Sequence, residues 1–121
     1  MNLWKETIDT LTEYGKTWND VVEIRGNKFR ISKENFEELA KDTNYDSGYG
    51  SQKIACDLKI YGNNWWLERG EYDGSEWWSF NTMEREIDIP LKTVESLCCG
   101  YHNTRIGWCS LSELNGKGEE E

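Results

Sequence analysis

The sequence has few of the residues that several large classes of function require. It has 14 Lys and Arg against 23 Asp and Glu, a formal net charge of −9, and its basic residues do not form clusters. Proteins that neutralise nucleic-acid phosphates or anionic membrane surfaces need such clusters, so we expect no direct nucleic-acid or membrane binding. No apolar run approaches the roughly 20 residues of a membrane span. The single histidine restricts proposals of acid–base catalysis.

Three functional signals are also missing. Residues 1–6 contain no charged segment followed by an apolar one, as a secretory signal would. No glycine-rich loop is followed by the lysine and helix of a phosphate-binding loop. No set of residues has the pattern of a catalytic constellation. We therefore expect a cytoplasmic, non-enzymatic protein without a cofactor, in which the four cysteines are free thiols.

Aromatic residues are abundant, at 13% of the chain, and they include seven tryptophans. Four of these form two adjacent pairs around Asp73 and Gly74, which predict a tight turn. Neighbouring residues of a strand point to opposite faces, so each pair places one indole on each side of a hairpin. One side can belong to the core. The other side must be covered or must bind something.

Alternation of apolar and polar residues extends this hairpin into a three-stranded meander over residues 53–81. We take Gly62 and Asn63 as the first turn, and Asp73 and Gly74 as the second. The two turns agree on one apolar face, formed by Ile54, Cys56, Leu58, Ile60, Trp65, Leu67, Trp78 and Phe80. The same registers predict the opposite face, formed by Lys59, Trp66, Glu68, Trp77 and Ser79, with Lys59 opposite Trp66 and Gly70 opposite Trp77.

The residues before the meander predict two helices and a second hairpin. Residues 3–14 have helical composition, and residues 33–42 have an amphipathic pattern with Ser32 as N-cap. Between them, a hairpin over residues 21–31 is closed by Gly26 and Asn27. This turn sets three residue pairs, Ile24 with Phe29, Val22 with Ile31, and Glu23 with Arg30.

The pattern is weaker in the last third of the chain. A short strand with Ile87 and Ile89 is expected before Pro90. Residues 91–98 fit a helical period, although another strand fits them too. A closing helical turn is expected to place three apolar residues in the core, Trp108, Leu111 and Leu114.

Together these patterns predict one α+β domain over residues 1–115 and a flexible acidic tail at residues 116–121. The domain consists of an antiparallel sheet with helices packed on it. The helix at 33–42 is the natural cover for the apolar face of the meander. The first helix either covers the face with Trp66 and Trp77 or leaves that face as a partly open aromatic patch.

Two clusters offer chemistry of other kinds. Four possible zinc ligands lie within twelve residues, namely Cys98, Cys99, His102 and Cys109. Their spacing lacks the C-x2-C knuckle, so buried small side chains and a surface thiol are the simpler interpretation, and a zinc-stabilised structural domain is the alternative. The carboxylates of the tryptophan hairpin resemble those of glycoside hydrolases, but charged residues at a hairpin end are normally solvated.

An aromatic patch with a carboxylate rim has the composition of a protein-binding hot spot and suits a basic partner. A polar loop at residues 43–51 adds two tyrosines of the kind that adaptable binding loops use. The candidate partner-binding residues are Trp66, Trp77, Glu68, Glu71, Tyr72, Tyr45, Asp46 and Tyr49. The alternative from another class is a small-ligand or carbohydrate-binding module that stacks sugar rings on the same tryptophans.

Residues 65–69 and 71–78 (WWLER and EYDGSEWW) resemble a motif in small uncharacterised acidic proteins of bacteriophages and mobile elements of Gram-positive bacteria. The resemblance extends over about residues 18–115 and carries no site residues. It implies an accessory protein of a mobile element. Such a protein would inhibit or redirect a basic host protein, such as a CRISPR or restriction nuclease.

Overall fold

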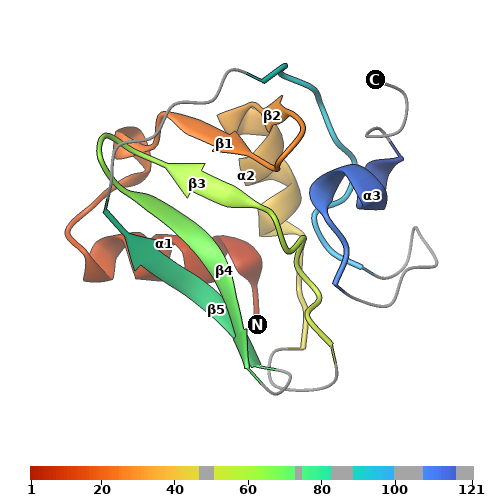
Figure 1. The fold of residues 1–121 in the computed structure, drawn as a ribbon. Coiled ribbons are helices and arrows are strands. Elements are labelled where there is room, and N and C mark those ends of the chain that lie inside the picture. The colour runs from red at the N-terminus through yellow and green to blue at the C-terminus, as the bar shows by residue number, and fades with distance from the viewer. Residues whose placement is uncertain (47–50, 73–74, 83–88, 100–107, 117–121) are drawn as a thin grey trace.

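A computed structural model describes residues 1–46, 51–72, 75–82, 89–99 and 108–116 (Figure 1). Its antiparallel sheet has the strand order β2-β1-β3-β4-β5. The strands are β1 (Glu23–Arg25), β2 (Arg30–Ile31), β3 (Lys59–Tyr61), β4 (Trp66–Tyr72) and β5 (Ser75–Asn81). The helices are α1 (Leu3–Glu13), the 3-10 helix η1 (Trp18–Asp20), α2 (Lys33–Lys41) and α3 (Leu111–Asn115). The predicted α+β class, with a hairpin and a meander in one sheet, is confirmed.

Helices α1 and α2 begin and end where the sequence indicates. The Asn2 side chain accepts a hydrogen bond from the Lys5 N–H, and the Ser32 side chain accepts one from the Asn35 N–H. Gly15 follows α1 with φ +74°, a left-handed conformation that stops a helix. Within the described segments, no helix has both the length and the apolar character that crossing a bilayer requires.

Both long helices lie on the same side of the sheet, behind it in Figure 1. The indole N–H of Trp78 donates to the Thr7 hydroxyl of α1 at 2.9 Å, and the Tyr14 ring stacks on Phe80 at 4.2 Å. Helix α2 packs against α1 through an aromatic cluster in which Trp4 contacts Phe36. Of the two alternatives for the first helix, the one in which it covers the face of Trp66 and Trp77 is therefore wrong. Neither α1 nor α2 covers that face, which we call the open face.

One cluster of buried side chains joins residues from Leu3 to Leu114. It is built from the covered face of the sheet and the inner faces of α1 and α2. The side chains with no exposed surface include Leu3, Ile24, Phe36, Ala40, Ile54, Leu58, Ile60, Leu67 and Leu111. Burial of such aliphatic and aromatic groups supplies the main driving force for folding.

The β4–β5 register is the predicted one, with Leu67 opposite Phe80, Arg69 opposite Trp78 and Gly70 opposite Trp77. The register between β3 and β4 differs from the prediction by two residues. Ile60 lies opposite Leu67, and the Gly62 N–H donates to the Trp65 carbonyl at 2.9 Å. The loop is therefore formed by residues 63 and 64. A shift of two residues leaves every side chain on its predicted face, because strand side chains alternate with period two.

The first hairpin is shifted in the same way. Ile24 lies opposite Ile31, and the Gly26 N–H donates to the Phe29 carbonyl. In both hairpins glycine flanks the loop because another side chain comes close to it. A Cβ atom on Gly62 would lie 2.0 Å from the Trp65 ring, and one on Gly26 would lie 2.7 Å from the Asp57 carboxylate.

Several predicted pairs consequently do not form. Lys59 lies opposite Glu68, where the charges are complementary, and does not face Trp66. Arg25 is the residue opposite Arg30, and Glu23 approaches the Arg25 guanidinium instead, at 3.4 Å. Val22, which was predicted to pair with Ile31, is exposed, and its neighbour Val21 is buried instead. Both valines precede β1, so strand alternation does not determine where their side chains point.

The predicted strand over residues 54–58 is wrong, because the chain turns there and Cys56 is exposed. The Leu58 N–H donates to the Ala55 carbonyl within this turn. The carboxylate of Asp57 points inward, where it accepts hydrogen bonds from the Asn27 N–H at 2.8 Å and the Leu111 N–H at 2.6 Å. These two distant donors fix a turn that the local alternation of residues does not reveal.

Of the two alternatives for residues 91–98, the helix is wrong, and the strand is reduced to isolated bridges. The backbone there pairs with other segments: Ile54 and Cys98 form an antiparallel bridge, and Arg30 and Leu91 form a parallel one. Trp108 is 59% exposed, with φ +55°, although the sequence predicts it in the core. Its N–H donates to the Gln52 carbonyl, which places the chain at the surface before α3. The expected strand residue Ile87 and most of the acidic tail lie outside the described residues.

Candidate functional site

The β4–β5 hairpin presents aromatic side chains on the open face. Alternation along β4 and β5 places Tyr72 and Trp77 on this face. Tyr72 is 76% exposed and Trp77 is 42% exposed. The Trp77 ring lies over Gly70, where an added Cβ would come within 2.6 Å of the indole nitrogen. Glu71 is exposed at the end of the same hairpin. We call Trp77, Tyr72 and the half-buried Glu68 the hairpin surface. The predicted contribution of Glu71 is wrong, because this neighbour of Tyr72 in β4 points to the other face of the sheet.

Trp66 shares the face but not the exposure of Trp77. Only 9% of its surface is exposed, and its ring stacks on Tyr61 with the centroids 6.0 Å apart. The guanidinium of Arg25 lies 4.4 Å from the centre of the Tyr61 ring and donates a hydrogen bond to the Tyr61 hydroxyl. The Trp66 indole N–H donates to the Glu68 carboxylate at 2.9 Å. Trp66 therefore belongs to a packed layer on the sheet and does not offer a free ring to a partner.

The loop contributes less than the sequence predicts. Tyr45 is buried, and its hydroxyl donates to the Glu6 carboxylate at 2.5 Å and accepts from the Arg69 guanidinium at 3.1 Å. Its ring is therefore withdrawn from any surface that a partner would contact. Asp46 is exposed, and Tyr49 lies outside the described residues.

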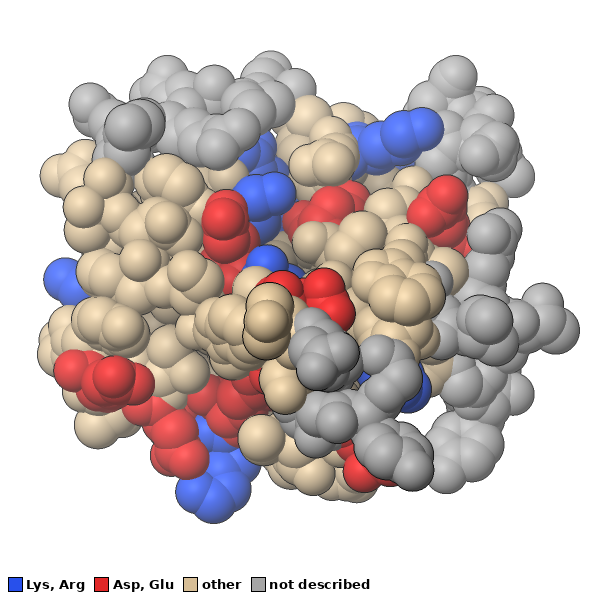
Figure 2. All heavy atoms as spheres, turned by 60° about the horizontal axis from the view of Figure 1, so that its bottom comes forward, with Lys and Arg blue, Asp and Glu red and all other residues tan. Residues whose placement is uncertain are grey.

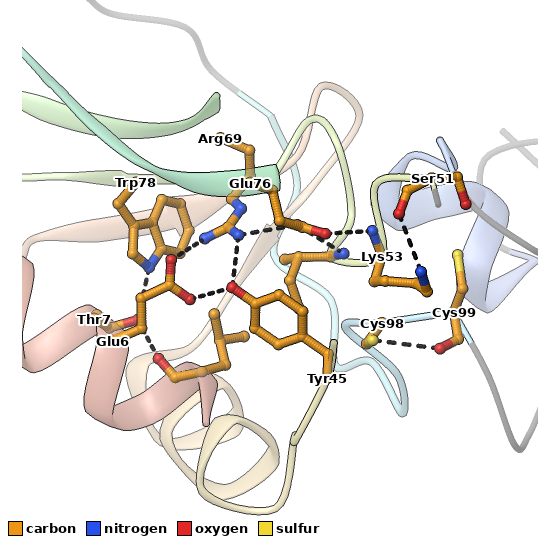
Figure 3. A network of polar contacts seen from close by, with 12 residues as sticks. Glu6, Thr7, Tyr45, Ser51, Lys53, Arg69, Glu76, Trp78, Cys98 and Cys99 are labelled. Atoms are coloured by element: carbon orange, nitrogen blue, oxygen red, sulfur yellow. Dashed lines mark hydrogen bonds and ion pairs between the residues drawn. The ribbon is translucent and has the colours of Figure 1, made fainter. Parts of the chain in front are cut away.

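Arg69 holds the centre of a buried polar network (Figure 3). Its side chain has no exposed surface, and its guanidinium forms ion pairs with Glu6 at 3.1 Å and Glu76 at 2.9 Å. The Trp78 ring lies 4.6 Å from the same guanidinium. Burial acts to lower the pKa of Arg69, but the charges of Glu6 and Glu76 and the contact with Tyr45 outweigh it and raise the pKa.

The carboxylate of Glu76 also accepts hydrogen bonds from the backbone N–H groups of Lys53 and Ile54, at 2.6 and 3.2 Å. The network thus joins α1, β4, β5 and the segment that begins at residue 51. Its carboxylates are paired and almost completely buried, so the arrangement suits a structural clamp and not acid–base chemistry on a substrate. The sequence indicates this network, because period-two alternation places Arg69 and Glu76 on the same covered face as the apolar residues of β4 and β5.

Acidic side chains are not gathered into one patch on the side of the molecule that carries α1 and the closed end of the β4–β5 hairpin. Figure 2 shows acidic and basic residues interspersed there among uncharged ones. Some of the acidic residues are paired with neighbouring lysines, as Asp9 is with Lys5 at 2.8 Å. Elsewhere acidic side chains do gather, because Glu34, Glu37, Glu38 and Asp42 of α2 and its C-cap line one surface hollow together with Lys41.

The cysteines are free thiols in the described residues, with Cys56 exposed, Cys98 and Cys99 half-buried, and Cys109 buried. The described residues contain no group of three His, Cys, Asp or Glu side chains that could hold a metal ion. His102, the remaining ligand of the predicted zinc set, lies outside them. The structure thus gives the zinc alternative no support among the residues that it describes.

These thiols predict a loss of stability in alkali. Burial, and then the charge of Glu76, raises the pKa of Cys98 to about 11, whereas burial and the nearby Cys109 raise the pKa of Cys99 to about 12. An unfolded thiol ionises near pH 8.5, so from about pH 8.5 to 11 the unfolded chain releases protons that the folded chain keeps. The free energy of unfolding should therefore fall as the pH rises through this range.

Urea unfolding at several pH values between about 7 and 11 measures this effect. The Cys98→Ala variant should show a smaller decline than the wild-type chain. Burial also raises the pKa of Tyr45. This residue contributes to the decline in both proteins, so its effect cancels in the comparison. An identical pH profile for the two proteins would contradict the assignment to Cys98.

Comparison with protein-family models, with curated proteins and with solved structures found no match to this chain.

Proposed function

We propose that this protein is a non-enzymatic binding factor that uses the hairpin surface to dock on a basic partner protein. The observation that carries the proposal is the exposure of Trp77 and Tyr72 on a face that neither α1 nor α2 covers. The two residues lie on neighbouring strands in diagonal positions, about 7–8 Å apart, so that one partner group can contact both rings. Large aromatic rings dominate the energetics of many protein interfaces.

Charge supplies the second part of the argument. The net charge of −9 favours encounter with a basic protein and disfavours acidic ones, and Glu68 lies on the same face of the sheet as the aromatic rings. The basic groove of a nucleic-acid enzyme is a surface of this kind. With the motif resemblance, this favours a cytoplasmic accessory factor of a phage or mobile element that inhibits or redirects a host protein such as a CRISPR or restriction nuclease.

The double variant Trp77→Ala, Tyr72→Ala tests the proposal. Removal of both rings should reduce retention of the partner by about tenfold or more, since a hot-spot ring contributes about 2 kcal/mol or more. The fold should persist, because both side chains are largely exposed. The measurement is quantitative affinity capture from a bacterial lysate at low and high salt, with urea unfolding to verify the fold.

Trp108→Ala is the matched control, because Trp108 is also exposed but lies outside the hairpin surface. It should retain the partner as the wild-type chain does. Equal retention by the double variant, or retention that does not weaken in high salt, would refute docking through this surface.

One observation favours a second candidate function. The Trp77 ring lies over Gly70 and the residue is 42% exposed, so the indole can stack on a sugar ring. Quenching of tryptophan emission by millimolar oligosaccharides, absent in Trp77→Ala, would support a carbohydrate-binding module. No change in emission would leave protein binding as the function of this surface.

A further inference from the structure

The two edges of the sheet differ. Along β2, the Pro90 carbonyl accepts a hydrogen bond from the Arg30 N–H, and the Lys92 N–H donates to the Arg30 carbonyl at 2.6 Å. Residues 89–92 therefore occupy this edge. Strand β5 forms the other edge, where β4 is its only strand neighbour among the described residues.

The register shows which backbone groups β5 directs outward. Its hairpin has a two-residue loop, so Tyr72 and Ser75 form the first hydrogen-bonded pair and alternate residues of β5 bond to β4. The N–H and carbonyl groups of Trp78 and Phe80 then point to the outer edge. In the part of the chain that the structure describes, no backbone group pairs with them. This edge can accept another strand.

Strand β5 lacks several of the devices that usually prevent two edges from joining. It has seven residues and contains neither proline nor lysine. Its one charged residue is Glu76, whose side chain is completely buried against Arg69. On the covered face, the Tyr14 ring, stacked on Phe80, is 45% exposed. The edge is thus uncharged and partly apolar, so an identical edge meets no local repulsion.

We propose that β5 pairs antiparallel with β5 of a second copy of this chain and joins two sheets into one. With the twofold axis at Ser79, Trp78 of each copy lies opposite Phe80 of the other, and about four backbone hydrogen bonds form. Assembly ends at two copies, because residues 89–92 occupy the opposite edge of the sheet that the described strands form. Repulsion between two chains of charge −9 opposes pairing, so added salt strengthens it.

Sedimentation equilibrium of the full chain tests this pairing between about 5 and 500 µM, at low and high salt. We expect a monomer–dimer equilibrium that salt shifts toward the dimer. Amide hydrogen exchange at Trp78 and Phe80 should slow as the protein concentration rises. A chain that stays monomeric at both salt concentrations, or forms assemblies larger than a dimer, overturns the proposal.

Ser79→Lys is the diagnostic variant, because it places two lysines opposite each other at the twofold axis. It should weaken the dimer by about tenfold or more. Thr12→Lys, on the exposed side of α1, has the same change in charge and should not weaken it. Equal dimerisation of both variants, with exchange at Trp78 and Phe80 independent of concentration, would show that the copies meet through another surface and overturn the proposal.

Discussion

Replacement of Arg69 by methionine is expected to lower the free energy of unfolding by about 3–5 kcal/mol. The Glu6 and Glu76 carboxylates lose their shared guanidinium and remain in a site where Glu76 has no exposed side-chain surface. Removal of one partner from a buried ion pair leaves an uncompensated charge, which is far less favourable than the pair. The Tyr45 hydroxyl loses a donor as well.

Urea unfolding measures this effect, and Lys5→Met provides the control. Lys5 pairs with Asp9 at 2.8 Å, but both side chains are mostly exposed, so its removal should change stability by less than about 0.5 kcal/mol. A loss as small as that of Lys5→Met would show that the buried network contributes nothing net to stability.

Replacement of Gly62 by alanine is the second change with a large expected effect. The new Cβ would lie 2.0 Å from the ring of Trp65, which is buried and stacked on Phe80. The ring and its neighbours must move, and overpacking of this kind costs about 1–3 kcal/mol. Strain in the glycine backbone does not contribute, because Gly62 has no positive φ.

Two further variants separate the causes. Gly15→Ala meets open space but has φ +74°, so its cost of about 1–2 kcal/mol comes from the backbone alone. In the double variant Gly62→Ala, Trp65→Ala the loss should be smaller than the sum of the single losses, because the ring that clashes is absent. Additive losses, measured by urea unfolding, would contradict a direct contact between residues 62 and 65.

The faces of the meander could be predicted from the sequence, whereas its registers could not. Period-two alternation places Leu67, Trp78 and Phe80 together whichever of two related turns is chosen, since a shift of two residues preserves the faces. The true register depends on Trp65 lying over Gly62, which is a contact between side chain and backbone. A glycine before an asparagine resembles a turn residue, and only the folded chain shows that it makes room for a ring.

In the candidate site, too, the face of each side chain could be predicted from the sequence, whereas its exposure could not. Alternation assigns Trp66 and Trp77 to one face, but their exposure is decided by strands from elsewhere in the chain. Tyr61 and Arg25 cover Trp66 because β1 lies beside β3, and nothing in the local pattern indicates that order. Tyr45 was predicted on a binding loop, yet its hydroxyl is drawn inward by Glu6 and Arg69, which lie 39 and 24 residues away in the sequence.

The clamp around Arg69 has a consequence for the order in which the chain acquires its structure. Glu6 meets Arg69 across 63 residues of sequence, and Thr7 meets Trp78 across 71. During synthesis, α1 leaves the ribosome long before either partner exists, and an isolated helix of 11 residues is only marginally stable in water. Closure of such long loops is slow, so α1 is among the last elements to dock, although it is made before the strands that it contacts.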